Sequence, residues 1–174
     1  MNKNIIEKAN YLTPQLFALT FLRVLIGWHF LFEGLVKLYT PGWSAKSYLL
    51  GSVGPLASIF KGLAQNESIL QIVDALNIWG LVLIGLSLFI GLLSKPSTIC
   101  GMVLLLVYYI AYPPFNGLEF NIHVEGSYWI VNKNLIEVAA LFVLYLFPSS
   151  HITGIDRFLG GYLAGIRKSG FKET

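Results

Sequence analysis

The sequence has 174 residues, enough for one domain, and 55% of them are hydrophobic while only 12% are charged. Ordinary soluble domains contain about 25% charged residues, so this composition excludes a soluble globular protein and predicts an all-α integral membrane protein, with residues 1–174 forming a single membrane domain. The net charge of +3 is modest, and the basic residues do not form one block, so nucleic acid is not an expected partner.

The first membrane-spanning helix is expected at residues 16–38, which would extend roughly 33 Å and cross the hydrocarbon core. This apolar stretch carries Arg23, Glu33 and Lys37 and has no small-residue cleavage site, so we expect it to be retained and not removed as a signal peptide. Pro41 and Gly42 end the helix.

An apolar segment that is too broken to span follows at residues 42–66. Gly51, Gly54 and Pro55 interrupt it. A stripe at helical spacing follows the interruption and consists of Leu56, Ile59, Phe60 and Leu63. The pattern predicts an interfacial helix or a lid over the bundle.

Three more spans are expected at residues 70–93, 98–112 and 130–147, which gives a four-transmembrane-helix bundle. Pro113 and Pro114 end the third span, and Pro148 ends the fourth. Near the C-terminus, apolar residues recur at helical spacing between charged ones. This pattern therefore predicts an amphipathic helix at residues 155–167 that lies on a membrane surface.

The placement of lysine and arginine predicts the orientation. Most basic residues outside the spans fall in the N-terminal tail, the turn before the third span and the C-terminal tail. We therefore expect a multi-pass protein of the inner (plasma) membrane with both termini cytoplasmic. The loops at residues 40–69 and 114–129 would lie outside.

Polar side chains inside the spans are costly, about 2.5–3.5 kcal/mol for a charged group at mid-membrane on insertion scales, so they should face the bundle interior. Each of the four spans carries such residues near its outer end. They are His29, Glu33, Lys37, Asp74, Asn77, Tyr108, Tyr109, Lys133, Asn134 and Glu137. Their common depth predicts one buried polar pocket, and the alternative interpretation is a set of ion pairs that only hold the helices together.

Within this pocket, the residue types suggest distinct roles. Glu33, Glu137 and His29 can exchange protons and are the candidate catalytic residues. The candidate substrate-binding residues are Lys37, Asp74, Asn77, Tyr109, Lys133 and Asn134. Arg23 and Asp156 are expected to be structural and to pair with each other at the cytoplasmic end. The three histidines are far apart and Cys100 is the single cysteine, so we expect no metal, haem or flavin site and no disulfide.

The order of these motifs resembles the DoxX/DoxD membrane protein family. The similar segments are Arg23 to Gly27, Glu33 to Leu38, the glycine-spaced Gly80 to Leu93, Tyr109 to Pro114, Val131 to Glu137 and Gly154 to Arg157. Together they extend over nearly the whole chain. The resemblance implies a four-helix membrane protein, and one branch of the family is the membrane subunit of a thiosulfate:quinone oxidoreductase that works with a second subunit.

Three functions fit this sequence. The first is the membrane subunit of a redox system that binds a quinone, or a small anion such as thiosulfate, and takes electrons from a redox partner subunit. The second is a non-enzymatic module that binds a lipid or a partner protein, with the buried charges serving helix assembly. The third is proton or solute transport by a homo-oligomer, although the sequence has no internal repeat of the kind that carriers use. Membrane lipid is an expected partner in each case.

Overall fold

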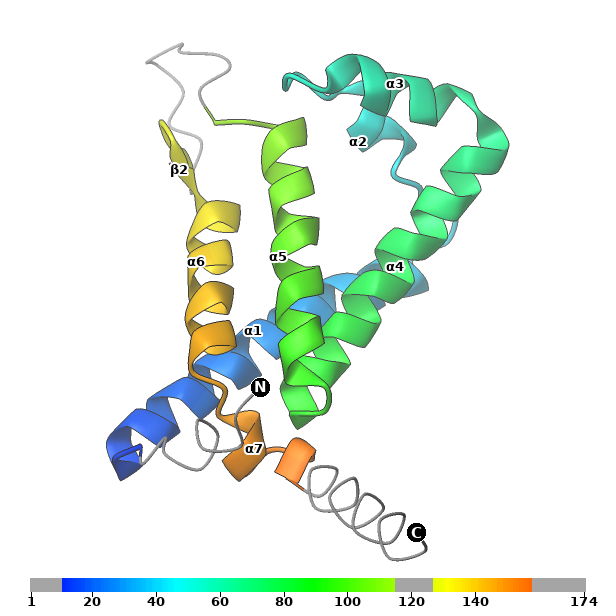
Figure 1. The fold of residues 1–174 in the computed structure, drawn as a ribbon. Helices are drawn as coiled ribbons and strands as arrows, with labels where there is room; N and C mark the ends of the chain where they lie inside the picture. Colours follow the sequence, from blue (N-terminus) through cyan, green and yellow to red (C-terminus); the bar gives the residue numbers. More distant parts are fainter. Residues whose placement is uncertain (1–10, 115–126, 158–174) are drawn as a thin grey trace, which may run out of the picture.

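The computed structural model describes residues 11–114 and 127–157. These residues are mostly helical (Figure 1). Among the described residues, three helices are long and apolar enough to cross a membrane: α1 (Thr13–Tyr39), α4 (Glu67–Ile90) and α5 (Ser94–Ala111). Large apolar side chains such as Phe21, Leu76 and Val103 are exposed on their outer faces, as expected for helices surrounded by hydrocarbon.

The shorter elements lie at the two ends of these helices (Figure 1). At one end are α2 (Lys46–Leu50) and α3 (Ala57–Gln65), and at the other is α7 (Ser150–Thr153). A two-stranded antiparallel hairpin, β1 (Ser127–Tyr128) and β2 (Val131–Asn132), leads into α6 (Lys133–Leu146). Helix α6 runs beside α5.

Helices α1 and α4 form one antiparallel pair that packs closely through glycines. A Cβ atom placed on Gly27 would lie 2.5 Å from the backbone nitrogen of Phe89, and one on Gly85 would lie 2.2 Å from that of Leu31. A Cβ atom placed on Gly34 would lie 2.8 Å from the backbone nitrogen of Val82. The two backbones can therefore approach only where these side chains are absent.

Two clusters of buried apolar residues hold the described part of the chain together. The larger core joins α1, α4, α5 and α6, and its buried residues are Ile26, Phe30, Leu81, Ile84, Leu88, Leu105, Leu141 and Leu144. The smaller core fixes α2 and α3 to α4 and α5 through Ala45, Leu49, Phe60, Ala64, Leu70 and Ala111. The segment expected to be an interfacial helix or lid thus folds as two short helices packed on one end of the larger helices.

Helix α4 is shifted relative to the expected 70–93. It begins after Asn66, whose side-chain oxygen accepts a hydrogen bond from the Ile69 N–H at 3.2 Å. It ends at Gly91, which adopts the left-handed conformation with φ of 72°. The turn is completed by Leu93, with φ of 52°, so Ser94 already belongs to α5, where the sequence predicted a start at residue 98.

Helix α6 is shorter than the expected span at residues 130–147. Trp129 has a positive φ of 57° in the hairpin turn, and Asn132 caps the helix by accepting a hydrogen bond from Leu135 at 3.0 Å. The helix therefore has 14 residues and rises about 21 Å. The surface helix expected at residues 155–167 lies outside the described residues from 158 onward.

Candidate functional site

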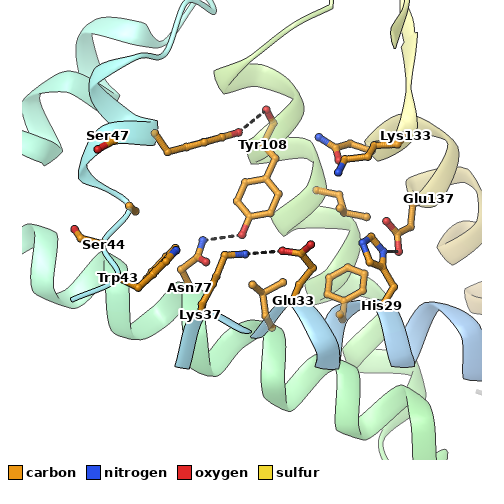
Figure 2. A pocket seen from close by; sticks show the side chains of 16 residues that line it. His29, Glu33, Lys37, Trp43, Ser44, Ser47, Asn77, Tyr108, Lys133 and Glu137 are labelled. Atoms are coloured by element: carbon orange, nitrogen blue, oxygen red, sulfur yellow. Dashed lines mark hydrogen bonds and ion pairs between the residues drawn. The ribbon is translucent and has the colours of Figure 1, made fainter. Parts of the chain in front are cut away.

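The end of the bundle that carries α2 encloses a cavity of about 430 Å³ (Figure 2). Residues from α1, α4, α5, α6 and the segment after α1 line it. They are His29, Phe30, Glu33, Lys37, Trp43, Ser44, Ala45, Ser47, Tyr48, Asn77, Leu81, Leu105, Tyr108, Lys133, Asn134 and Glu137. A cavity of this size is within the range of small-molecule sites in proteins.

An ion pair between α1 and α6 lies on one wall of the cavity (Figure 2). The Nδ1 atom of His29 is 2.8 Å from Oε1 of Glu137, and the two residues are 108 positions apart in the chain. The Glu137 side chain is 11% exposed, whereas that of His29 is 45% exposed. The imidazole thus keeps an accessible edge while the buried carboxylate orients it.

A second ion pair lies within α1 itself. Lys37 Nζ donates to Oε2 of Glu33 at 3.2 Å, one turn away along the helix. The same ammonium lies 5.7 Å from the centre of the Trp43 ring, in the geometry of a cation–π contact. Glu33 remains accessible from the cavity, because its side chain is 47% exposed.

Tyrosines form the wall on the α2 side. Asn77 Nδ2 donates to the Tyr108 hydroxyl at 2.6 Å, the Tyr48 hydroxyl donates to the Tyr108 carbonyl at 3.3 Å, and the Tyr112 hydroxyl donates to the Tyr48 carbonyl at 2.8 Å. Burial, together with the neighbouring tyrosines, raises the pKa of Tyr48 above its ordinary value. Its hydroxyl therefore stays protonated and serves as a hydrogen-bond donor at neutral pH.

The cavity has both polar and apolar walls. The two carboxylates are compensated by their partners, Glu33 by Lys37 and Glu137 by His29, and Lys133 adds a further cation to the wall. Apolar surface comes from Phe30, Leu81 and Leu105, all of which are buried in the larger core. The arrangement suits an uncharged molecule that has a flat apolar body and polar atoms at its edges.

The structure brings seven of the nine predicted catalytic and substrate-binding residues to this cavity: His29, Glu33, Lys37, Asn77, Lys133, Asn134 and Glu137. Asp74 and Tyr109 do not line it. The Asp74 carboxylate accepts a hydrogen bond from the Ala45 N–H at 2.8 Å, and the Tyr109 hydroxyl donates to the Ile130 carbonyl at 2.8 Å. Each of these two side chains instead fastens a connecting segment to a helix.

The sequence reasoning missed the contribution of α2 and of the segment that leads into it from α1. Trp43, Ser44, Ala45, Ser47 and Tyr48 form one side of the cavity. A signal was present, because serines and aromatic residues cluster just after the helix-ending Pro41-Gly42. The sequence predicts an interfacial helix or a lid over the bundle for residues 42–66, but nothing in the spacing of these side chains shows that they line a cavity.

Arg23 and Asp156 lie at the opposite end of the helices and do not pair directly. Among the described residues, the ion pairs are His29–Glu137 and Lys37–Glu33. Arg23 is 3% exposed and donates to the Leu88 carbonyl at 2.7 Å and to the Ser149 hydroxyl at 3.3 Å. It thus satisfies a carbonyl in the last turn of α4, where the helix dipole favours a cation.

Within the part of the chain that the structure describes, no group of three or more histidine, cysteine, aspartate and glutamate side chains could hold a metal ion. Comparison with protein-family models, with curated proteins and with solved structures finds no match to this chain. The similarity to DoxX/DoxD proteins therefore stays a prediction from the motifs.

Proposed function

We propose that this protein is the membrane subunit of a redox system, of the DoxX/DoxD type, and that it binds a quinone in the cavity beneath α2. In this proposal α6 is the fourth membrane crossing, both termini are cytoplasmic and the cavity lies in the outer half of the inner membrane. The observation that carries the proposal is the His29–Glu137 pair, with its 2.8 Å contact, on the wall of a cavity with an apolar floor.

The chemistry of quinone reduction fits the two ion pairs. Reduction to a quinol requires two electrons and two protons, one proton for each carbonyl oxygen. His29, hydrogen-bonded to Glu137, would donate a proton to one carbonyl oxygen. The Lys37–Glu33 pair would donate the proton to the other. The electrons would come from a redox partner subunit, and the ring would lie against Phe30, Leu81 and Leu105.

A quinone suits the cavity better than thiosulfate does. Thiosulfate carries two negative charges, and both Glu33 and Glu137 face the space it would occupy. Lys37 is already paired with Glu33 at 3.2 Å and His29 with Glu137 at 2.8 Å, so among the described lining residues only Lys133 is left to offset a dianion. A neutral ring avoids this repulsion and still meets hydrogen-bond donors at its carbonyl oxygens.

Substitution of Glu137 tests the proposal. Purified protein in lipid nanodiscs should bind a benzoquinone analogue, and Glu137→Gln should weaken that binding about tenfold, the effect of losing one charge-assisted hydrogen bond. Glu67→Gln is the matched control, because Glu67 is exposed in the first turn of α4 and does not line the cavity. Absence of quinone binding, or equal affinities of the two variants, would contradict the proposal.

The second candidate is the non-enzymatic module, and a different aspect of the same pair favours it. Helix α1 packs mainly against α4, and α6 packs mainly against α5, so His29–Glu137 links two helix pairs. If this link serves assembly alone, Glu137→Gln lowers the thermal unfolding temperature of a protein that binds no quinone. Measuring unfolding and quinone binding on the same samples separates the two candidates.

A further inference from the structure

A groove on the outer surface of the bundle adjoins the cavity. It lies between α1 and α6, has a volume of about 370 Å³, and its apolar walls are Leu22, Leu25, Ile26, Ile136 and Ala140. Leu25 and Ile136 are 49% and 57% exposed, so the groove opens to the surroundings of the helices. In a membrane, those surroundings are lipid chains.

The groove and the cavity share three residues. His29, Lys133 and Glu137 line both, so the proton-exchanging pair lies at the boundary between the two spaces. From His29 to Leu22 the groove extends seven residues along α1, about 10 Å. That direction leads from the cavity toward the middle of α1, which in a membrane is the middle of the hydrocarbon layer.

We propose that the groove holds the hydrocarbon tail of a lipid-soluble quinone whose ring occupies the cavity, and that the ligand enters sideways from the bilayer between α1 and α6. This inference rests on the proposed function. A ring bound near His29 would direct its tail along the apolar wall of α1 and α6 and not across the charged wall of Lys37 and Glu33. The weak packing between α1 and α6 leaves room for this path.

Two quinones that differ only in the tail test the inference. A benzoquinone with a long saturated tail should bind more tightly than the same ring without the tail. Ala140→Phe fills the groove and should weaken binding of the tailed probe about tenfold, with little effect on the tailless one. Ala139→Phe is the control, because Ala139 is the exposed neighbour on the same helix and does not line the groove.

The outcomes separate this inference from the proposed function. If the unsubstituted protein binds neither probe, both the groove inference and the proposed function are overturned. Equal affinities for the two probes, or equal effects of Ala140→Phe and Ala139→Phe, overturn only the inference that the groove holds the tail. If Ala140→Phe does not fold, a tailed quinone with a diazirine at the end of the tail decides. It should label the unsubstituted protein at Leu22 to Ile26 and Ile136 to Ala140, and labelling on the lipid face of α4, at Ile72 or Leu83, overturns the inference.

Discussion

At the scale of single residues, Asp156 stabilises a helix to which it does not belong. Its two carboxylate oxygens accept hydrogen bonds from the backbone N–H groups of Leu93 and Ser94, at 2.6 and 3.2 Å, and so cap the start of α5. Burial acts to raise the pKa of Asp156, but the nearby Ser150 hydroxyl and these two backbone donors outweigh it and hold the pKa below its ordinary value.

Removal of this cap should destabilise the protein in a pH-dependent way. Asp156→Ala should cost about 0.5–2 kcal/mol near neutral pH, the range for a lost helix cap. Because folding lowers the pKa, the stabilisation is present above the unfolded pKa of about 4 and disappears as the pH falls through the lower folded value. Thermal unfolding should show the gap between wild type and variant closing in acid. Lys95→Ala, an exposed change in the first turn of α5, should lack this pH dependence.

The site residues that sequence reasoning found share a simple periodicity. Glu33 and Lys37, one turn apart, form an ion pair, and Glu137 lies one turn beyond Lys133 on the cavity wall. Tyr108 and not Tyr109 lines the cavity, because adjacent helical residues point about 100° apart and the sequence does not show which one faces inward. Asp74 bonds instead to the Ala45 N–H, which belongs to a loop whose path is set only by tertiary packing and so could not be placed from the sequence.

At the scale of elements, the α1–α4 contact depends on particular glycines, and two glycines of α4 make a matched pair. Gly85 is buried against α1, and a Cβ atom placed on it would lie less than 3 Å from atoms of Leu31. A Cβ atom placed on Gly80 would have no atom within 4 Å. The sequence does not distinguish them, because both lie in the same apolar stretch. Only the register of α1 against α4 shows which one faces the partner helix.

Alanine substitutions at these two positions should therefore differ in sign. Gly85→Ala should push α1 and α4 apart and cost about 1–3 kcal/mol, as overpacking does. Gly80→Ala should be neutral or stabilising by up to about 1 kcal/mol, because alanine favours the helix. Unfolding of both variants in the same detergent compares them directly. A Gly80→Ala variant as unstable as Gly85→Ala would contradict the assigned packing.

Element boundaries could be predicted only in part. Apolar length located three long helices, and proline and glycine located most of their ends. The start of α5 was missed because its cap, Asp156, comes from more than sixty residues away in sequence. The start of α6 was missed because Ile130 to Asn132 are apolar enough to resemble a helix but belong to a hairpin whose turn needs a positive φ at Trp129.

At the scale of the whole molecule, the distribution of basic residues predicts which side of the membrane each end of the helices faces, and exposed positions at both ends allow a test. In a protein whose Cys100 is replaced by alanine, single cysteines would be placed at Lys61, Lys95, Trp129 and Arg157, all exposed. Positions 61 and 129 should react with a membrane-impermeant maleimide in intact spheroplasts, and positions 95 and 157 only in inverted vesicles.

This labelling also decides whether α6 crosses the membrane. Cysteines at 129 and 157 flank α6, so their reaction from opposite sides means that the chain crosses between them. Reaction of both from one side would leave three crossings and contradict the four-span arrangement. By length and composition, three helices of the described residues could cross a membrane, and α6, with 14 residues, is shorter than these.

The helices of the two packed pairs differ in length, and this affects the surrounding lipid. Helices α1 and α4 have 27 and 24 residues, and would extend about 40 and 36 Å, while α5 and α6 have 18 and 14 residues, and would extend about 27 and 21 Å. A hydrocarbon layer of about 30 Å fits neither pair, so in the four-span arrangement the long pair must tilt and the leaflets beside the short pair must compress. The protein would therefore carry a locally thinned bilayer around α5 and α6, and membranes with shorter acyl chains would accommodate it at the lowest cost.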